Sequence, residues 1–386
     1  MAEKKIIYAD HAATTRISQS VLEAMLPYFQ DGYGNASGVY GLARSARKAI
    51  EEARRQTADA LGALPDSIYF TSGGTEADNW AVREAAYAGR TSGKTHLITS
   101  NIEHHAVLHT CRRLEEEGFT ITRIPANAEG MVSPEQVREA LRPETALVSI
   151  MYANNEIGTI QPVDAIGSLC RQHGVLFHTD AVQAVGHLPI HLERQPVDLL
   201  SLSGHKLGAP KGIGALYIRK GVTLPNLMEG GGQEHGRRPG TENTALIVGL
   251  GIAMQEAASR MEEDSRYIAR LRDLLEQRLL TIPATRLNGD RLQRLPGISS
   301  VSFDGIEGET MLLLLDMQGI CASAGSACAT GSPQPSHVLR AIGLSDRQAK
   351  GTIRFSLGSE NTEQEISYIA KTVEEIAERL RAMTLG

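Results

Sequence analysis

Residues 175–184, VLFHTDAVQA, and residues 199–212, LLSLSGHKLGAPKG, each begin with a short apolar run and end in polar or small residues. Such runs are typical of buried strands. Similar runs recur between Ile68 and Arg219, separated by helix-like segments. Because neighbouring parallel strands are joined by crossover helices, this alternation predicts a largely parallel sheet in an α/β domain. The other runs are HLITSN (96–101), TALVSIMYANN (145–155) and GALYIRK (214–220).

The composition is that of an ordinary folded protein. The chain has 386 residues, of which 41% are hydrophobic, enough for a large core and about two domains. A net charge of −6 and the lack of any Lys/Arg cluster argue against a nucleic-acid binder with a basic surface. The N-terminus lacks the apolar segment of a signal peptide, and no stretch approaches the roughly 20 apolar residues that span a bilayer. We therefore expect a cytoplasmic protein without a membrane anchor.

The four cysteines show no CxxC spacing, so neither a zinc site nor a disulfide framework is indicated, and reduced thiols are expected. Cys328 differs from the others because it lies among small residues in CASAGSACATGS (321–332). A buried thiol needs large apolar neighbours, so this segment predicts a mobile loop that displays Cys328. Cys321 follows an apolar segment and is predicted to end a buried strand, with Cys111 and Cys170 likewise structural.

Two amphipathic helices are predicted after the glycine-rich segment EGGGQEHGRRPGTEN (229–243). Apolar residues recur at steps of three and four between Met261 and Leu280, which predicts a long helix with a domain boundary near it. Thr362 and Glu365 match a capping box at the start of the final helix. The apolar stripes of both helices indicate packing rather than a binding site.

Lys206 and Asp180 lie within the two segments quoted first. A lysine flanked by small residues at a strand end can project into a cavity, where it can form a Schiff base. A carboxylate buried like Asp180 needs a cationic partner, and the protonated ring nitrogen of pyridoxal phosphate (PLP) would supply one. Taken separately, Lys206 also fits a surface lysine, and Asp180 fits a turn or helix-capping aspartate. Together they fit a PLP site.

Two further segments offer cofactor contacts. In FTSGGTEADNW (70–80), two glycines precede Thr75 at a predicted helix start, where free amides favour phosphate, although such a pattern can also be a simple turn. In NIEHHAVLHT (101–110), an imidazole at the sheet edge could stack on a cofactor ring and move protons. His105 and His109 have the spacing of a metal-binding pair. No carboxylate third ligand accompanies them, so we predict surface histidines and no metal site.

Taken together, these segments resemble the cysteine desulfurases of the NifS/IscS type, which are fold-type I PLP enzymes. The resemblance covers the whole chain, in the family's order. It rests on DHAATT (10–15), TSGGTEADN (71–79), EHHAV (103–107), NNEIGTIQP (154–162), HTDAVQA (178–184), SGHK (203–206), GGGQEHGRRPGTEN (230–243), GSAC (325–328) and IRFSLG (353–358).

The resemblance implies the α/β fold of fold-type I PLP-dependent transferases. The expected large PLP-binding domain spans residues 15–260 and contains a mainly parallel seven-stranded sheet flanked by helices. Residues 1–14 and 261–386 are expected to form a smaller α/β domain that carries the Cys328 loop.

Position by position, the resemblance also implies roles for site residues. Lys206 forms the Schiff base, Asp180 pairs with the ring nitrogen and Gln183 hydrogen-bonds the phenolic oxygen of PLP. Asn155 and Arg354 hold the substrate carboxylate, for which a guanidinium fork is suited. For Arg354, a buried structural Arg–Glu pair is the alternative. The remaining implied PLP contacts are His104 on the ring and Gly74, Thr75, Ser203, His205 and Thr241 at the phosphate, with Thr241 supplied by the second subunit of a homodimer.

The implied reaction converts L-cysteine to L-alanine. Lys206 removes the α-proton, the Cys328 thiolate attacks the substrate sulfur and keeps it as a persulfide, and His104 assists thiolate formation. The persulfide then passes to an acceptor protein, either an iron–sulfur scaffold or an enzyme of thio-cofactor or tRNA thiolation. Acceptor choice depends on surface patches that one sequence does not mark.

Some segments depart from the family pattern. NASGVYG (35–41) stands where the family has Asn-Pro-Ser-Ser-x-His, His11 replaces an asparagine, and the sequence ends at RAMTLG without the extension that scaffold-docking members carry. These departures concern the substrate entrance and scaffold docking. None of them touches Lys206, Asp180 or Cys328.

Three other functions would use similar cofactor contacts. A class V aminotransferase has no use for Cys328 and needs a keto acid. A selenocysteine lyase would use the same machinery on selenocysteine. A non-catalytic PLP-fold partner in sulfur-carrier assembly would fold normally but show no turnover.

Overall fold

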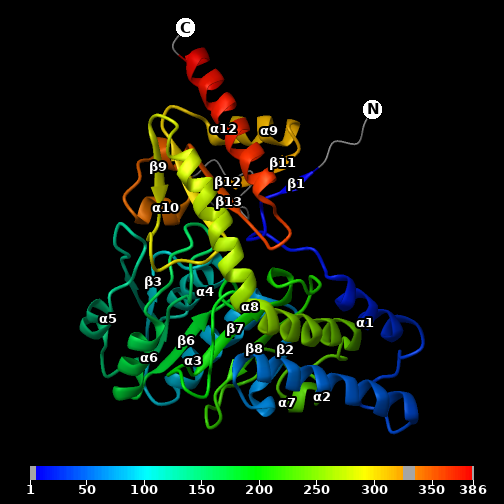
Figure 1. Cartoon of the computed structure of the whole chain (residues 1–386). Helices are drawn as coiled ribbons and strands as arrows, with labels where there is room; N and C mark the ends of the chain where they lie inside the picture. The colour runs from blue at the N-terminus through cyan, green and yellow to red at the C-terminus, as the bar shows by residue number, and fades with distance from the viewer. Residues whose placement is uncertain (1–5, 325–334, 385–386) are drawn as a thin grey trace.

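A seven-stranded sheet forms the centre of the computed structural model, which describes residues 6–324 and 335–384 (Figure 1). Within these residues, β8 pairs antiparallel with both of its neighbours, and the other pairs of this sheet are parallel. The predicted mainly parallel α/β sheet is therefore confirmed. In spatial order its strands are β2 (Ile68–Thr71), β8 (Gly214–Ile218), β7 (Leu199–Ser203), β6 (Leu176–Asp180), β5 (Thr145–Ser149), β3 (His96–Ser100) and β4 (Thr120–Ile124).

Helices cover both faces of this sheet, which explains why its central strands are nearly continuous apolar runs. On one face, apolar residues of α3 (Gly74–Arg90) and α4 (His105–Glu116) pack on the strands around the buried Trp80. The other face is covered by α1 (Gln19–Gln30), α2 (Gly41–Leu61), α5 (Pro134–Ala140), α6 (Val163–Gln172) and the first half of α8 (Thr244–Leu279).

A second, four-stranded antiparallel sheet has its own hydrophobic cluster, to which α9 (Gly308–Met317), α12 (Glu363–Thr384) and the second half of α8 contribute. Its strand order is β12 (Ser323–Ala324), β13 (Thr352–Ser356), β10 (Ile298–Phe303) and β9 (Thr285–Asn288). Beside it, β1 (Ile7–Tyr8) pairs in parallel with β11 (Ile320–Cys321). Cys321 thus ends a strand as predicted, although the strand is short and the side chain is half-buried.

Helix α8 is longer than the sequence pattern suggested. The predicted helix began near Met261, whereas the observed one begins after Asn243, whose side chain accepts a hydrogen bond from the Leu246 amide at 3.2 Å. The first half was missed because its small residues serve close packing: a Cβ on Gly251 would lie 2.6 Å from Ala53 Cα. The helix joins the two clusters (Figure 1), and we propose the division at residue 260 as a boundary within it.

The final helix begins as predicted. The Thr362 amide donates to Glu365 Oε2 at 3.1 Å, and the Glu365 amide donates to Thr362 Oγ1 at 3.3 Å, which is a capping box. Among the described residues, no helix is long and apolar enough to cross a membrane. The remaining short elements are η1 (Pro65–Ser67), η2 (Gly204–Lys206), α7 (Gln233–Gly236), α10 (His337–Ala341) and α11 (Asp346–Lys350).

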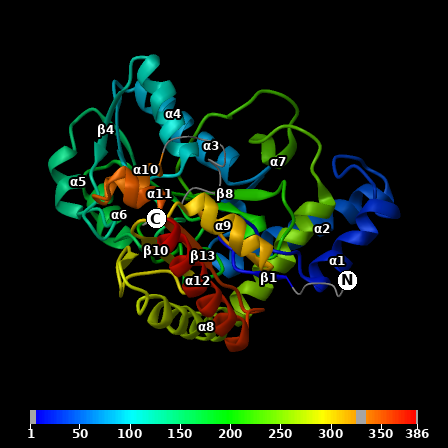
Figure 2. The same ribbon diagram turned by 90° about the horizontal axis from the view of Figure 1, so that it is seen from above.

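Helices α10 and α11 are late in the sequence but belong to the site rather than to the small sheet's core. Apolar side chains of both helices, including Leu339, pack on Ile102 and Met151, which follow β3 and β5. In the view from above, α10 lies on the same side of the molecule as α5 and α6 (Figure 2). The segment that re-enters the described structure at residue 335 is therefore attached to the large sheet.

Candidate active site

A cavity of about 340 Å³ opens where the central parallel strands end. Strands β6 and β7 run side by side, so their last residues, Asp180 and Ser203, reach the same edge of the sheet. This edge is where ligands bind in open α/β sheets. The structure brings together at this cavity the predicted residues Gly74, Thr75, His104, Asn155, Asp180, Gln183, Ser203, His205, Lys206 and Arg354.

The backbone of the DHAATT segment orients two of the predicted cofactor residues. Lys206 Nζ donates to the carbonyl oxygens of Ala12 at 2.6 Å and Ala13 at 2.8 Å, and Gln183 Nε2 donates to the Ala12 oxygen at 2.9 Å. Beside them, Asp180 is buried and its Oδ1 accepts the Val182 amide at 2.9 Å. Both carbonyls therefore orient the Lys206 nitrogen, whose neutral amine form could bind a cofactor aldehyde.

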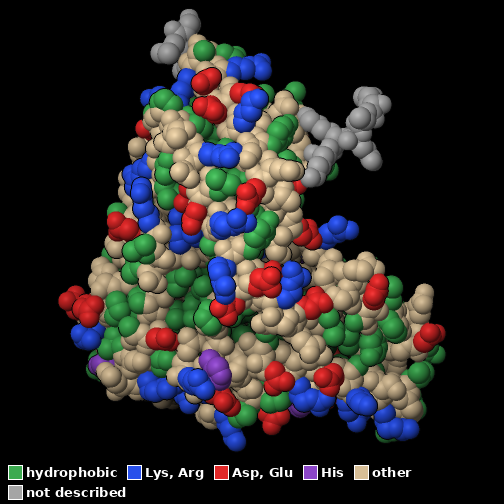
Figure 3. Space-filling view, viewed as in Figure 1, with side chains coloured by type: hydrophobic (Ala, Val, Ile, Leu, Met, Phe, Trp, Pro, Cys, Tyr) green, Lys and Arg blue, Asp and Glu red, His purple; other side chains and the backbone are tan. Residues whose placement is uncertain are grey.

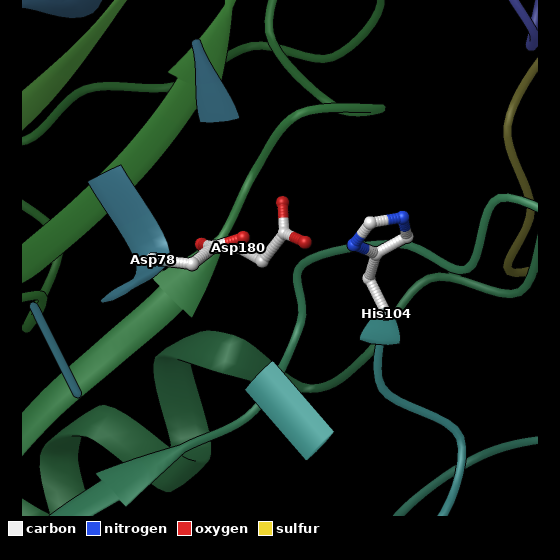
Figure 4. Close-up of side chains that lie close together, drawn as sticks. All are labelled: Asp78, His104 and Asp180. Atoms are coloured by element: carbon white, nitrogen blue, oxygen red, sulfur yellow. The ribbon is translucent and has the colours of Figure 1, made fainter. Parts of the chain in front are cut away.

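His104 is the N-cap of α4, and its Nδ1 accepts the Ala106 amide at 3.1 Å. That bond fixes the neutral ring in the tautomer with its proton on Nε2. The imidazole faces the Asp180 carboxylate, with Asp78 behind it (Figure 4). Polar atoms of Asp78, His104 and Asp180 lie within 4.8 Å of one another. A cation could also occupy such a space, but the two predicted ring contacts favour the cofactor ring here.

The start of α3 forms a cradle for an anion. Gly73 adopts φ 153°, which a side chain would disfavour, and a Cβ on Gly74 would lie 2.6 Å from Val182 Cγ2. Two glycines thus let the helix start approach the sheet edge, where its free amides and the Thr75 hydroxyl can hold phosphate. The acidic side chain of the first turn, Glu76, is neutralised by Arg238 through contacts of 2.8 and 3.0 Å.

His205 also lies at this end of the cavity. Burial, together with Lys206 and Lys211, lowers the pKa of its imidazole to about 4, so the ring is neutral at pH 7. Its Nδ1 lies 3.2 Å from Thr14 Oγ1. We infer that His205 can contact a phosphate only as a neutral hydrogen-bond donor.

The glycine-rich segment 229–243 is anchored firmly beside α3. Glu234, in the left-handed region at φ 46°, accepts two hydrogen bonds from the buried Arg54, at 2.9 and 3.0 Å. This holds Thr241 in a separate cavity of about 190 Å³, away from the main one. The prediction that Thr241 serves a neighbouring subunit stays a prediction. The other site residue absent from the main cavity, Cys328, lies outside the described residues.

The opposite end of the cavity is formed by Arg354 of β13, which is only 1% exposed. Its Nη2 bonds Asp10 Oδ1 at 2.8 Å and its Nη1 donates to the Asn155 carbonyl at 2.9 Å. Within the described residues its buried Nε has no hydrogen-bond partner. Arg354 thus forms a buried ion pair, with Asp10 rather than with a glutamate, and it also lines the cavity beside Asn155. Its role toward the substrate carboxylate stays a prediction.

Sequence reasoning missed several cavity residues. Asp78 could have been found, because it lies three residues after Thr75 and hence on the same face of α3. Glu156 follows Asn155 and bonds the Ser336 hydroxyl, and burial raises the pKa of its carboxyl. His337 had no local signal, since only the fold brings it to the cavity.

The histidine pair of α4 is partly as predicted. His109 is exposed, but His105 is half-buried, and the two rings stack with centroids 4.9 Å apart. The His337 ring lies 4.8 Å from that of His105. His337 Nε2 is 2.9 Å from the Glu103 carbonyl oxygen, which ties α10 to this end of the large sheet.

Residues 7–369 match the family model for class V aminotransferases. The chain therefore belongs to the class V aminotransferase family. This is the class that the strand-end lysine and aspartate define.

Comparison with individual proteins shows which group within this family the chain resembles. The chain is 52% identical to "Cysteine desulfurase IscS" of Methanosarcina thermophila over 382 residues, which cover 99% of this chain and 94% of that protein. It is 50% identical to "Cysteine desulfurase IscS" of Clostridium botulinum, covering 98% of this chain and 96% of that protein. Within the family, the chain thus groups with the cysteine desulfurases, which confirms the resemblance found in the sequence.

Solved structures agree. A "NifS-like protein" aligns with a TM-score of 0.91 at 39% identity, covering 97% of this chain and all of that one. A structure of "SspA in complex with cysteine" aligns with a TM-score of 0.81 at 40% identity, covering 92% of this chain and 99% of that one. The fold is thus that of NifS-like, fold-type I PLP enzymes.

The residues present fit PLP, the cofactor of this family. The cavity offers a glycine-lined helix start for a phosphate, a buried carboxylate for a protonated ring nitrogen and a lysine for an aldehyde. The three groups are contributed by α3, β6 and η2, which meet at one sheet edge.

Proposed function

We propose that this chain removes sulfur from L-cysteine, releases L-alanine and retains the sulfur as a persulfide on Cys328. The observation that carries the proposal is the single cavity that joins Lys206 and Asp180 to Arg354, in a chain about half identical to cysteine desulfurases. Bound PLP would supply an electron sink for the negative charge that forms on the substrate carbon.

Each cavity end has its own task in this proposal. Arg354 and Asn155 hold the substrate carboxylate, which would complete the hydrogen bonding of the guanidinium. Lys206 would hold the cofactor through its aldehyde, and the free Lys206 amine is the proposed base that takes the proton from the substrate Cα. The Ala12 and Ala13 carbonyls, which accept from Nζ, keep the amine at this position.

The sulfur transfer proceeds by thiolate attack. As the Cys328 sulfur bonds to the substrate sulfur, the carbon–sulfur bond breaks and its electron pair stays on the carbon. That carbon takes up a proton, which leaves alanine and a persulfide. No external oxidant is needed, because the carbon is reduced while the sulfur is oxidised.

A homodimer is part of the proposal. Hydrophobic side chains are exposed on α1 and on the segment before α2, including Phe29 (58%), Tyr33 (73%) and Val39 (88%). They gather in the lower right of the space-filling view (Figure 3). A patch of this kind suits a second copy of the chain. The ion-paired loop that presents Thr241 beside α2 supports the same arrangement, in which each copy completes the other's phosphate site.

The sulfur acceptor is proposed only by class. We propose that the persulfide sulfur passes to a thiol of a second protein, such as an iron–sulfur scaffold or a thiolation enzyme. A cytoplasmic location stays a prediction from the sequence.

The test is alanine production from L-cysteine by the PLP-loaded protein. We expect turnover in the presence of a reductant, loss of alanine in Cys328→Ala, and retention of activity in the matched control Cys321→Ala. Alanine formed by Cys328→Ala at the parent rate would refute the sulfur transfer. Activity that requires a keto acid would indicate an aminotransferase instead.

A further inference from the structure

Two buried carboxyl groups lie close together beneath the proposed cofactor ring. Asp78 of α3 is 1% exposed and Asp180 of β6 is 5% exposed. Each has an oxygen within 4.8 Å of the other and of a His104 ring nitrogen (Figure 4). Two carboxylates so close and so deeply buried cannot both be charged at neutral pH without a large electrostatic cost. One of them must hold a proton.

The surroundings of Asp180 favour the negative charge there. Its Oδ1 accepts the Val182 amide at 2.9 Å, a bond that is stronger to a carboxylate than to a carboxylic acid and therefore favours the charged form. Lys206 lies close enough to stabilise an anion at this position. The proposed function adds a second positive group, the protonated ring nitrogen.

Asp78 has no comparable stabilisation. Its buried Oδ1 lacks a hydrogen-bond partner among the described residues, and burial and the neighbouring Asp180 raise the pKa of its carboxyl more than the nearby Ser201 hydroxyl lowers it. His178 Nε2 is 3.6 Å away but supplies no charge, since burial lowers the pKa of that imidazole to about 3. The two His178 nitrogens instead face hydroxyls, Ser149 Oγ at 2.8 Å and Ser201 Oγ at 3.0 Å.

A third buried acid, Glu103, adds no positive charge that could stabilise an anion at Asp78. Glu103 lies behind the same edge, and burial raises the pKa of its carboxyl to about 8. Its Oε1 accepts the Ser100 hydroxyl at 2.5 Å and the Met151 amide at 3.0 Å. Glu103 is either neutral or negative, so it offers no positive charge that would stabilise an ionised Asp78.

We propose that Asp78 carries the proton of the pair, so that Asp180 alone is the anion that faces the cofactor ring. Asp78 is thus a positioning residue, whose neutral acid group fills the space behind Asp180 without competing for the positive ring. The part of this inference that concerns the ring rests on the proposed function. The protonation of the pair itself depends only on the contacts above.

The test is carbon NMR of the full-length protein labelled at the aspartate side-chain carboxyl, recorded across pH before and after PLP is added. Comparison with Asp78→Asn assigns the Asp78 signal. We expect the chemical shift of this carbon to show a protonated Asp78 carboxyl group at pH 7, both before and after PLP is added. In Asp180→Asn its titration midpoint should fall by about one to two pH units, since the neighbouring charge is gone. A purely structural role would not produce this shift.

Asp198→Asn is the control. Asp198 is also buried, but it pairs with Arg219 at 2.5 Å and lies outside the Asp78–Asp180 pair, so its signal should be unaffected by Asp180→Asn. If Asp180→Asn does not fold, the reciprocal experiment serves: the Asp180 signal should titrate at nearly the same pH in Asp78→Asn as in the parent, because the removed Asp78 carboxyl is already neutral when Asp180 ionises.

Two results would overturn the inference: an Asp78 carboxyl that is ionised at pH 7, or a midpoint that does not respond to the Asp180 substitution. Neither readout uses catalysis. Failure of the alanine assay would therefore leave this inference standing, and failure here would leave the desulfurase proposal standing.

Discussion

The two ends of the cavity are built differently. At the cofactor end, α3, β6 and η2 supply Thr75, Asp180 and Lys206 at the ends of three strands of one sheet, β2, β6 and β7. At the substrate end, Arg354 comes from the small antiparallel sheet and is held by the Asn155 carbonyl and by Asp10, which lies 344 residues away in sequence. The cofactor end is therefore local to one sheet, whereas the substrate end exists only when the two sheets are packed together.

The two ends of the cavity also differ in their buried charges. The cofactor end buries three acids, Asp78, Glu103 and Asp180, against few fixed cations. The substrate end buries a guanidinium that already has one carboxylate partner. We conclude that the first end is prepared for a positive ring and the second for a negative substrate group.

The largest expected effect belongs to the cofactor end. Lys206→Ala removes both the Schiff-base amine and the proposed base for Cα, so alanine formation should fall by roughly 10⁴-fold. The visible absorption band of the bound cofactor should change as well. The exposed Lys211 provides the matched control, Lys211→Ala, which should leave both readouts unchanged. An unaltered band in Lys206→Ala would remove this lysine from the site.

Glu103 tests the buried acids through stability. Its pKa of about 8 lies above the ordinary value of 4.5, so the folded protein binds this proton more tightly than the unfolded chain. The stabilisation is complete below about pH 4.5 and is lost as pH rises through 8. Over that window the free energy of unfolding of the parent should fall by about 3–5 kcal/mol more than that of Glu103→Gln.

Denaturant unfolding of the apoprotein at several pH values measures this difference. Glu129→Gln, at an exposed site, is the control and should follow the parent. Parallel pH curves for Glu103→Gln and the parent would show that the Glu103 carboxyl is not held neutral by the fold.

At the substrate end, Arg354→Lys keeps a positive charge but loses the guanidinium fork. We expect kcat/KM for L-cysteine to fall about 100-fold, with the cofactor spectrum unchanged, because the two ends are separate. Arg294→Lys is the control, since this buried arginine pairs with Glu276 and does not line the cavity. A changed cofactor spectrum in Arg354→Lys would contradict the separation of the two ends.

A smaller effect is expected for Asp10→Ala. The 2.8 Å contact with Asp10 holds one arm of the guanidinium, so its loss should raise KM about 10-fold and leave kcat nearly unchanged. Steady-state kinetics distinguishes this positioning role from competition between Asp10 and the substrate carboxylate for Arg354. A lower KM in Asp10→Ala would mean that Asp10 competes with the substrate carboxylate for Arg354.

The same comparison shows how much the sequence could predict. Strand periodicity located the edge at which Asp180 and Lys206 meet, because parallel strands place their last residues side by side. Arg354 was found only through the family resemblance, since nothing in its neighbourhood marks a contact with Asp10. His337 was not found at all, because it reaches the cavity through packing of α10 on distant residues.

The distance between the two buried acids was the other quantity that the sequence did not reveal. The sequence showed an acid at 78 and an acid at 180, but not that their oxygens lie within 4.8 Å of each other. It also placed the start of the long helix α8 too late, because the glycines and alanines of its first half resemble a loop when their packing on α2 is unknown.

The most direct test of the proposed function is mass spectrometry of the PLP-loaded protein after incubation with L-cysteine and no reductant. We predict one additional sulfur atom on the peptide that contains Cys328, and an equal amount of alanine in solution. Alanine without added mass on that peptide, or added sulfur on Cys321 instead, would contradict the assignment of Cys328 as the sulfur carrier.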